Sequence, residues 1–265
     1  MEVCKYLERK NIAEVTYLDV DKNGLVDLKQ LEKELKPETV LVSIIYANNE
    51  IGTIQDIKKI SKIIKKHNAS GKLSVVSCEL HIDACQASEY LTLDVKKLGV
   101  DLMTINSSKV YGPKGVGALY VKNGVSIKPL MYGGHQENGL RPGTENVAGI
   151  VGLAKALEIA QGYKLQELRD YFIEELFKRI PKIKLNGHKA KRLPNNVNIS
   201  IMDIEGEALL LHMNEKGIYA STGSACASGS LDPSHVIMAL GVPQEVAQGS
   251  LRFTLGRKTT KKDID

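Results

Sequence analysis

Hydrophobic positions along the chain alternate between runs of strand length and stretches with helical spacing. Strand-like patterns cover residues 13–18, 40–46, 73–82, 100–105 and 115–121. Helical spacing covers residues 2–10, 28–35 and 57–66, and an Asp-Lys-Asn-Gly turn is expected at 21–24. The run at 40–46 is apolar throughout, which is typical of a strand buried on both faces. Strands that alternate with helices predict an α/β fold with a largely parallel sheet.

The pattern changes after residue 144. Helices are expected at 147–160, 163–180 and 207–214, and strands at 196–202, which alternates as if half-buried, and at 250–255. This mixture favours a second, smaller α+β domain. We place the boundary near Gly162, which gives a large domain at 1–162 and a small domain at 163–265.

Polar residues follow three of the expected strands directly. Asn49, Asp83 and Lys109 each come just after the carboxyl end of an apolar run. Ligands of open α/β sheets bind at this edge, so these three side chains are candidates for one site.

Charge and cysteine content narrow the function classes. The 265 residues carry a net charge of +5, and the lysines at 58–66 alternate with isoleucines, which indicates the solvated face of a helix. Direct nucleic-acid binding rests on this modest charge alone and is therefore the least favoured function. No apolar stretch is long enough to span a membrane and no signal-peptide pattern begins the chain, so a cytoplasmic protein is expected.

The four cysteines have neither metal-binding nor disulfide spacing. Cys4, Cys78 and Cys85 have apolar or strand-like neighbours, which is typical of small core residues. Cys226 differs, because glycine, serine and alanine surround it. That composition predicts an exposed, mobile loop with a reactive thiol.

Lys109 and Asp83 are weak candidates when each is considered alone. A lysine that forms a Schiff base needs a fixed position and a lowered pKa, and Lys114 in the same turn is a rival for this role. Asp83 could equally be a helix N-cap. As a pair they suit pyridoxal phosphate (PLP), whose pyridine nitrogen is held protonated by an aspartate.

Six segments together resemble the cysteine desulfurases of the NifS/IscS type, within the class V aminotransferase-like PLP enzymes. These segments fall in the family's order and are Asn-Asn-Glu-Ile-Gly at 48–52, His-Ile-Asp-Ala-Cys-Gln at 81–86, Ser-x-Lys-x-Tyr-Gly-Pro-Lys-Gly at 107–115, Arg-Pro-Gly-Thr-Glu-Asn at 141–146, Gly-Ser-Ala-Cys-Ala-Ser at 223–228 and Ser-Leu-Arg-Phe-Thr-Leu-Gly-Arg at 250–257. The resemblance implies the fold of PLP-dependent transferases of fold type I.

The resemblance also implies cofactor contacts. Lys109 would hold PLP covalently, Asp83 would pair with the pyridine nitrogen, and Gln86 would contact the ring hydroxyl. The phosphate would be bound by Asn106, Ser107 and Ser108, and by Thr144 lent across a homodimer interface. No metal is implied.

The remaining implied roles concern substrate and sulfur. Asn49 and Arg252 would bind the carboxylate of L-cysteine, and Cys226 would take its sulfur as a persulfide, leaving alanine. A sulfur-acceptor protein, either an iron–sulfur scaffold or a tRNA-thiolation relay, would be the next partner.

Two positions depart from the family pattern. Ser108 stands where many members have a histidine, and Asn106 stands where a serine is frequent. The segment that carries the family's phosphate loop and its ring-stacking histidine has no match in residues 1–47, so the chain is expected to be truncated at the N-terminus and slightly at the C-terminus.

Two other functions remain open at this point. Selenocysteine lyases and other class V lyases share the lysine and the aspartate, although the Cys226 loop favours a desulfurase. A truncated, inactive dimerisation partner is the non-enzyme alternative, and the retention of Lys109, Asp83, Arg252 and Cys226 argues against it.

Overall fold

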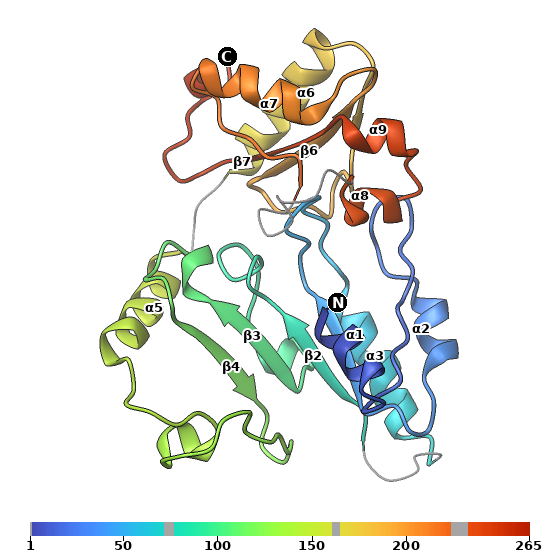
Figure 1. The fold of residues 1–265 in the computed structure, drawn as a ribbon, viewed down its shortest axis with the longest axis vertical. Helices are drawn as coiled ribbons and strands as arrows, with labels where there is room; N and C mark the ends of the chain where they lie inside the picture. Colours follow the sequence, from blue (N-terminus) through green and yellow to red (C-terminus); the bar gives the residue numbers. More distant parts are fainter. Residues whose placement is uncertain (1, 72–76, 161–164, 224–232) are drawn as a thin grey trace.

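The computed structural model describes residues 2–71, 77–160, 165–223 and 233–265. Its strands form two separate sheets, one of four strands and one of three. Each sheet lies in its own half of the molecule (Figure 1). The predicted boundary near Gly162 lies outside the described residues, and the division into two domains stays a prediction.

The first sheet has the order β1 (Leu41–Ile45), β2 (Glu79–Asp83), β3 (Leu102–Asn106), β4 (Gly117–Val121). β1, β2 and β3 are parallel, and β4 is antiparallel to β3. The α/β prediction with a largely parallel sheet is therefore confirmed.

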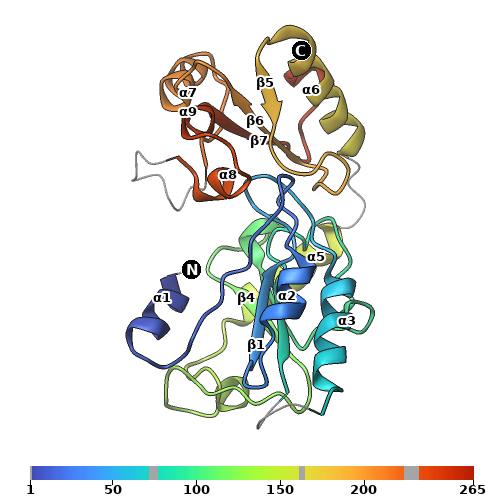
Figure 2. The same ribbon diagram turned by 90° about the vertical axis from the view of Figure 1, so that its right-hand side faces the viewer.

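Helices cover one face of this sheet. α2 (Leu28–Glu34), α3 (Ile57–Asn68) and α4 (Val95–Leu98) share a core with alternate residues of β1 and β2, including Ile44 and Leu80. Figure 2 shows α3 on one side of β1 and α1 (Glu2–Arg9), which buries no residue, on the other. The isoleucines of α3 face the core and its lysines face solvent, as their spacing predicts.

Two strand predictions are wrong. β1 is not buried on both faces, because the helices pack on Val42 and Ile44 only and leave Leu41 and Ile45 about half exposed. Residues 13–18 form no strand, since no neighbouring strand offers them hydrogen-bond partners; the pairing here is one bridge between Val20 and Val26 around the predicted turn.

The second sheet is antiparallel and has the order β5 (Ile183–Leu185), β6 (Asn196–Ile201), β7 (Ser250–Thr254). α6 (Gln166–Arg179) and α7 (Gly206–Glu215) pack against it. β6 was expected to be half-buried, but all six of its residues are buried. The reason is that its polar face, which includes Asn196 and Asn198, is covered by residues of the first half of the chain.

The remaining helical elements of the described residues complete the fold. They are η1 (Ser107–Lys109), η2 (Gln136–Gly139), α5 (Val147–Ala160), α8 (His235–Ala239), α9 (Gln244–Gln248) and η4 (Lys261–Asp263). α5 packs on the turn after β3, where Val110 and Leu153 share a small core. A second small core joins Ile51 from the loop after β1 to Ile237 of α8. This loop and the hairpin at residues 20–26 extend from the first half of the molecule to the second (Figure 1).

Candidate active site

The carboxyl ends of β2 and β3 bring Asp83 and Lys109 to one edge of the first sheet. Asp83 is the last residue of β2 and lies beside Thr104 of β3, whose carbonyl accepts a hydrogen bond from Ala84 at 2.9 Å. β3 ends two residues later and continues into η1, which ends at Lys109. The ammonium group of Lys109 is near enough to Cys85 to act electrostatically on its thiol. The shared edge that the sequence predicts is therefore present in the structure.

Asp83 organises the turn that follows it. Its Oδ1 accepts a hydrogen bond from the backbone N–H of Cys85 at 2.9 Å. Residues 85–90 form turns and not a helix, so the helix N-cap considered from the sequence is not what Asp83 provides. Burial, together with a hydrogen bond from the thiol to Asp83, raises the pKa of Cys85 to about 12. Cys85 is therefore a protonated thiol in neutral solution.

The turn that carries Lys109 is held tightly by its own backbone. The carbonyl of Ser107 accepts hydrogen bonds from the N–H of Val110 at 3.1 Å and from that of Gly112 at 3.0 Å. Tyr111 between them has a φ of 61°, a left-handed conformation that is strained for a bulky residue. A Cβ at Gly112 would lie 2.2 Å from the Ser107 hydroxyl, so this position requires glycine.

The three residues expected at the phosphate differ in their partners. The Oδ1 of Asn106 accepts hydrogen bonds from both the backbone N–H and the hydroxyl of Ser108, at 2.8 and 2.7 Å, so Asn106 caps η1. Ser107 is completely buried, and its hydroxyl has no hydrogen-bond partner among the described residues. A buried hydroxyl without a partner is unfavourable unless a ligand supplies one.

Arg252 of β7 reaches the loop after β1, where Asn49 lies. Its Nη1 donates a hydrogen bond of 3.0 Å to the Asn49 carbonyl, which is 203 residues away in sequence. Its Nε is buried and, within the described parts of the chain, has no acceptor. Burial lowers the pKa of the guanidinium and the nearby Glu50 opposes this shift. The structure thus brings the Arg252 guanidinium into hydrogen-bond contact with the backbone of Asn49.

Glu50 is a buried residue of this site that the sequence analysis did not single out. Its carboxylate accepts a hydrogen bond from the Ser234 hydroxyl, and its carbonyl accepts from the side-chain amides of Asn196 and Asn198, at 2.9 and 3.1 Å. The signals present in the sequence were the glutamate inside the Asn-Asn-Glu-Ile-Gly segment and the polar side chains alternating along 196–200.

Two other predicted residues, Gln86 and Thr144, differ in their exposure. Gln86 is partly buried in the turn after Asp83, and Thr144 is exposed between η2 and α5. The segment between β4 and α5 extends away from the second half of the molecule (Figure 1). Cys226 lies outside the described residues, so its loop stays a prediction.

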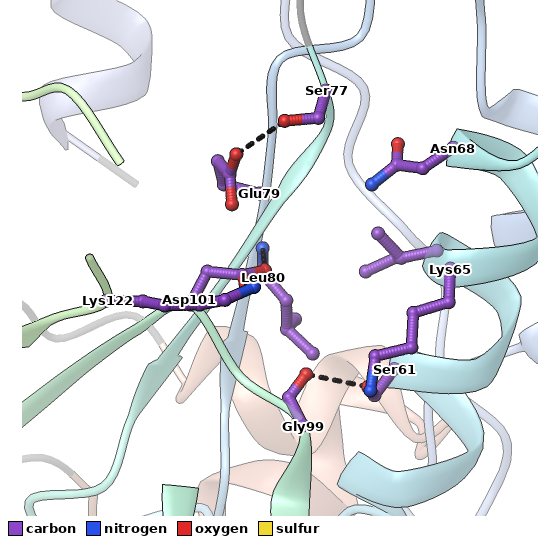
Figure 3. A pocket seen from close by; sticks show the side chains of 10 residues that line it. Ser61, Lys65, Asn68, Ser77, Glu79, Leu80, Gly99, Asp101 and Lys122 are labelled. Carbon is purple, nitrogen blue, oxygen red and sulfur yellow. Dashed lines mark hydrogen bonds and ion pairs between the residues drawn. The ribbon is translucent and has the colours of Figure 1, made fainter. Parts of the chain in front are cut away.

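A cavity of about 160 Å³ lies elsewhere, at the amino end of β2 (Figure 3). The Ser61 hydroxyl donates to the carbonyl of Gly99 at 2.7 Å, and Lys122 pairs with Asp101 at 2.7 Å. These polar groups bind one another, at the end of the strands opposite Asp83. The cavity therefore lies away from the candidate site.

Metal-ligand clusters and membrane-length apolar helices are both absent from the part of the chain that the structure describes. It holds no cluster of three or more histidine, cysteine, aspartate or glutamate residues suited to a metal ion. Among its helices, none combines the length and the apolar character required to cross a bilayer.

Comparison with known proteins assigns the family. The chain matches the Aminotransferase class-V family over residues 1–265 and belongs to it. In solved structures the fold is similar to that of a NifS-like protein, with a TM-score of 0.88 and 37% identity over all of this chain and 68% of that one. A structure described as SspA in complex with cysteine has a TM-score of 0.81 and 31% identity, over 96% of this chain and 69% of that one. The fold type I prediction is confirmed.

Curated relatives narrow the resemblance to cysteine desulfurases. The chain is 50% identical to the cysteine desulfurase IscS of Dictyoglomus turgidum and 51% identical to that of Methanosarcina thermophila. Each comparison covers all of this chain, but only 66% and 64% of those proteins. The chain thus spans just under two thirds of the length of these relatives, and the resemblance proposed from its motifs is confirmed.

Proposed function

We propose that this protein is a cysteine desulfurase, which converts L-cysteine to L-alanine with PLP and transfers the sulfur to Cys226. The observation that carries the proposal is the convergence of Asp83 and Lys109 at one sheet edge, with Arg252 reaching the loop of Asn49 from the second sheet. The curated relatives that bear the name cysteine desulfurase support the same activity.

The residues present fit PLP. A carboxylate at the end of β2 suits a pyridinium N–H, and the buried, unpartnered hydroxyl of Ser107 suits a phosphate oxygen. Bound PLP supplies an electron sink for negative charge that develops at the substrate's α-carbon. Lys109 would hold it covalently.

Each of these side chains has a proposed task. Asp83 keeps the pyridine nitrogen protonated, and Gln86 hydrogen-bonds the ring hydroxyl. Lys109 moves a proton to and from the substrate's α-carbon, as a neutral lysine amine can. Asn106 and Ser108 stabilise the turn that carries Ser107. Asn106, Ser107 and Ser108 are all proposed to lie near the phosphate.

Arg252 and Asn49 are proposed to orient the substrate carboxylate, since a guanidinium binds a carboxylate through two parallel donors. The Cys226 thiolate then attacks the sulfur of the substrate. The sulfur–sulfur bond forms as the carbon–sulfur bond breaks, and the carbon retains the electron pair and takes up a proton. One L-cysteine and one thiol thus give one L-alanine and one persulfide, with no external oxidant.

A homodimer is the proposed assembly. The segment 130–132 exposes Leu130, Met131 and Tyr132, and α5 exposes Val147 and Val151. Such apolar surface is typical of a subunit interface. Thr144 lies between these two exposed segments, which supports its proposed role at the phosphate of the second subunit.

The persulfide is proposed to pass to an acceptor protein that serves iron–sulfur cluster assembly or tRNA thiolation. The cytoplasm is the proposed compartment, because a reducing environment keeps thiols such as Cys4, Cys78 and Cys85 unpaired, as they are in the structure.

The test is to trap the cofactor and then to assay turnover. Purified protein is incubated with PLP, reduced with borohydride and mapped by peptide mass spectrometry, with Lys109→Ala as the variant and Lys114→Ala as the matched control in the same turn. A single label at Lys109 that is lost only in Lys109→Ala, and alanine formed from L-cysteine, would support the proposal. Scattered labels would favour an inactive dimerisation partner instead.

The acceptor role of Cys226 is tested separately. Cys226→Ser is expected to abolish persulfide formation and alanine release from L-cysteine. Alanine release that stays unchanged in Cys226→Ser, with faster turnover of selenocysteine than of cysteine, would contradict the desulfurase assignment and indicate a selenocysteine lyase.

A further inference from the structure

Arg257 lies just after β7 and contacts both turns of the candidate site. Its Nε donates a hydrogen bond of 2.9 Å to a carboxylate oxygen of Glu89, in the turn that begins at Asp83. Its guanidinium carbon lies 4.4 Å from the centre of the Tyr111 ring, two residues after Lys109. One side chain therefore joins the Asp83 turn to the Lys109 turn.

Burial makes the ion pair with Glu89 a strong constraint. The side chains of Glu89 and Arg257 are 4% and 16% exposed, so little solvent can replace either partner. Removing one member of a buried pair leaves the other charge uncompensated, which is far more unfavourable than losing a surface pair. The position of Arg257 is thus fixed by Glu89.

The Lys109 turn has a feature that requires external support. Tyr111 adopts a left-handed backbone conformation, with a φ of 61°, that a bulky residue keeps only when its surroundings enforce it. Arg257 supplies three contacts here: the stack on the Tyr111 ring, a long hydrogen bond of 3.5 Å to the Val110 carbonyl, and a backbone N–H directed at the Tyr111 hydroxyl at 3.4 Å.

We propose that Arg257, fixed by Glu89, is a positioning residue that holds Tyr111 in its strained conformation and thereby sets the geometry of the Lys109 turn. The catalytic consequence rests on the proposed function of Lys109, whereas the constraint on the turn does not. Arg252 lies on β7, and Arg257 follows the end of the same strand, so one short segment carries both the guanidinium proposed to bind substrate and the side chain proposed to hold the Lys109 turn.

The experiment measures amide hydrogen exchange in the cofactor-free protein. The amides of Val110 and Gly112 close the Lys109 turn and report on it directly. The variants are Arg257→Met, which keeps the length of the side chain, Arg257→Lys and Glu89→Gln. The matched control is Lys261→Met, which removes a similar cation–aromatic contact, 4.2 Å from the Tyr171 ring and remote from Lys109 in sequence.

We expect exchange at Val110 and Gly112 to become at least about tenfold faster in Arg257→Met and in Glu89→Gln, and to stay unchanged in Lys261→Met. Amides in the core of β6 and β7 should keep their protection, which separates a local role from general unfolding. Arg257→Lys keeps the charge opposite Glu89 and should recover part of the protection. PLP affinity, measured by the yield of borohydride label at Lys109, should fall about tenfold with the loss of protection.

Unchanged exchange at both amides in Arg257→Met would overturn the inference, and so would an equal gain of exchange over the whole protein. If Arg257→Met does not fold, Glu89→Gln, which keeps the shape of the glutamate, decides between these outcomes. Absence of PLP label at Lys109 in the wild type would refute the proposed function alone, because the exchange experiment contains no cofactor.

Discussion

Ser234 offers a direct test of how the two halves of the molecule are joined. Its hydroxyl donates a hydrogen bond to the buried carboxylate of Glu50 and accepts from the N–H groups of Val236 and Ile237, which makes it the N-cap of α8. Ser234→Ala removes all of these bonds without adding volume. We expect it to destabilise the protein more than the loss of a helix cap does.

The size of the effect follows from the two kinds of contact. Loss of an N-cap costs about 1 kcal/mol. A hydrogen bond to a charged group contributes about 1.5–3 kcal/mol, and here the carboxylate belongs to Glu50, which is only 2% exposed. Ser234→Ala should therefore lower the free energy of unfolding by about 2.5–4 kcal/mol.

Urea unfolding followed by circular dichroism measures this change. The matched control is Asp27→Ala, because Asp27 caps α2 through the N–H groups of Lys29 and Gln30 and is otherwise exposed, so only the cap is lost. Asp27→Ala should cost about 1 kcal/mol. Ser234→Thr keeps a hydroxyl and should stay close to the wild type.

A double-mutant cycle assigns the excess to the Glu50 contact. Glu50→Gln keeps an acceptor for Ser234 but removes the charge, so Ser234→Ala should destabilise this background by about 1 kcal/mol less than it destabilises the wild type. If Ser234→Ala costs no more than Asp27→Ala, or if the two substitutions at 50 and 234 are additive, the reasoning fails.

Three further predictions concern groups near the candidate site. Burial lowers the pKa of His81 from its ordinary value of 6.5, so the stability that depends on neutral His81 is complete above pH 6.5 and is lost as the pH falls below it. In His81→Asn, the urea midpoint should therefore decrease less between pH 7.5 and 5.5 than it does in the wild type. An equal decrease in both proteins would contradict this. Because the pKa of Cys85 is about 12, roughly one molecule in 10⁴ carries its thiolate at pH 8, and iodoacetamide should modify Cys85 far more slowly than Cys4; equal rates by mass spectrometry would refute this. Gly112→Ala should destabilise the protein by about 1–3 kcal/mol through the Ser107 hydroxyl, and Ser107→Ala should restore part of the loss in thermal unfolding.

Elements with one buried face were predictable from the sequence. Ile57, Ile60 and Ile64 recur at helical spacing, and each is buried in α3. The burial of β1 was predicted wrongly because its sequence carries apolar residues on both faces. An apolar run such as 40–46 shows only that every residue in it tolerates burial. Which faces of the strand are covered depends on the elements that pack there, and the helices cover only one face of β1.

Some features of the candidate site were likewise predictable from the sequence, and others were not. Asp83 and Lys109 lie at one edge because Asp83 ends β2 and Lys109 follows β3, and these two strands are parallel neighbours in the sheet. The environment of Glu50 could not be found in this manner, since its partner Ser234 is 184 residues away and only tertiary packing brings them together. Local patterns contain no information on such pairs.

The residues proposed to bind substrate come from two parts of the fold. Asn49 lies in the loop after β1 and Arg252 lies on β7, and the two sheets share no strand among the described residues. Neither core alone therefore fixes the distance between Arg252 and Lys109. That distance depends on the docking of the loop after β1, through the Asn49 carbonyl and the buried Glu50. We expect both sheets to keep their cores when this docking is weakened, because the core of the first sheet and the core of the second consist of separate sets of residues. Substitutions at Glu50 should consequently raise the KM for L-cysteine at temperatures well below unfolding, which a purely stabilising contact would not do.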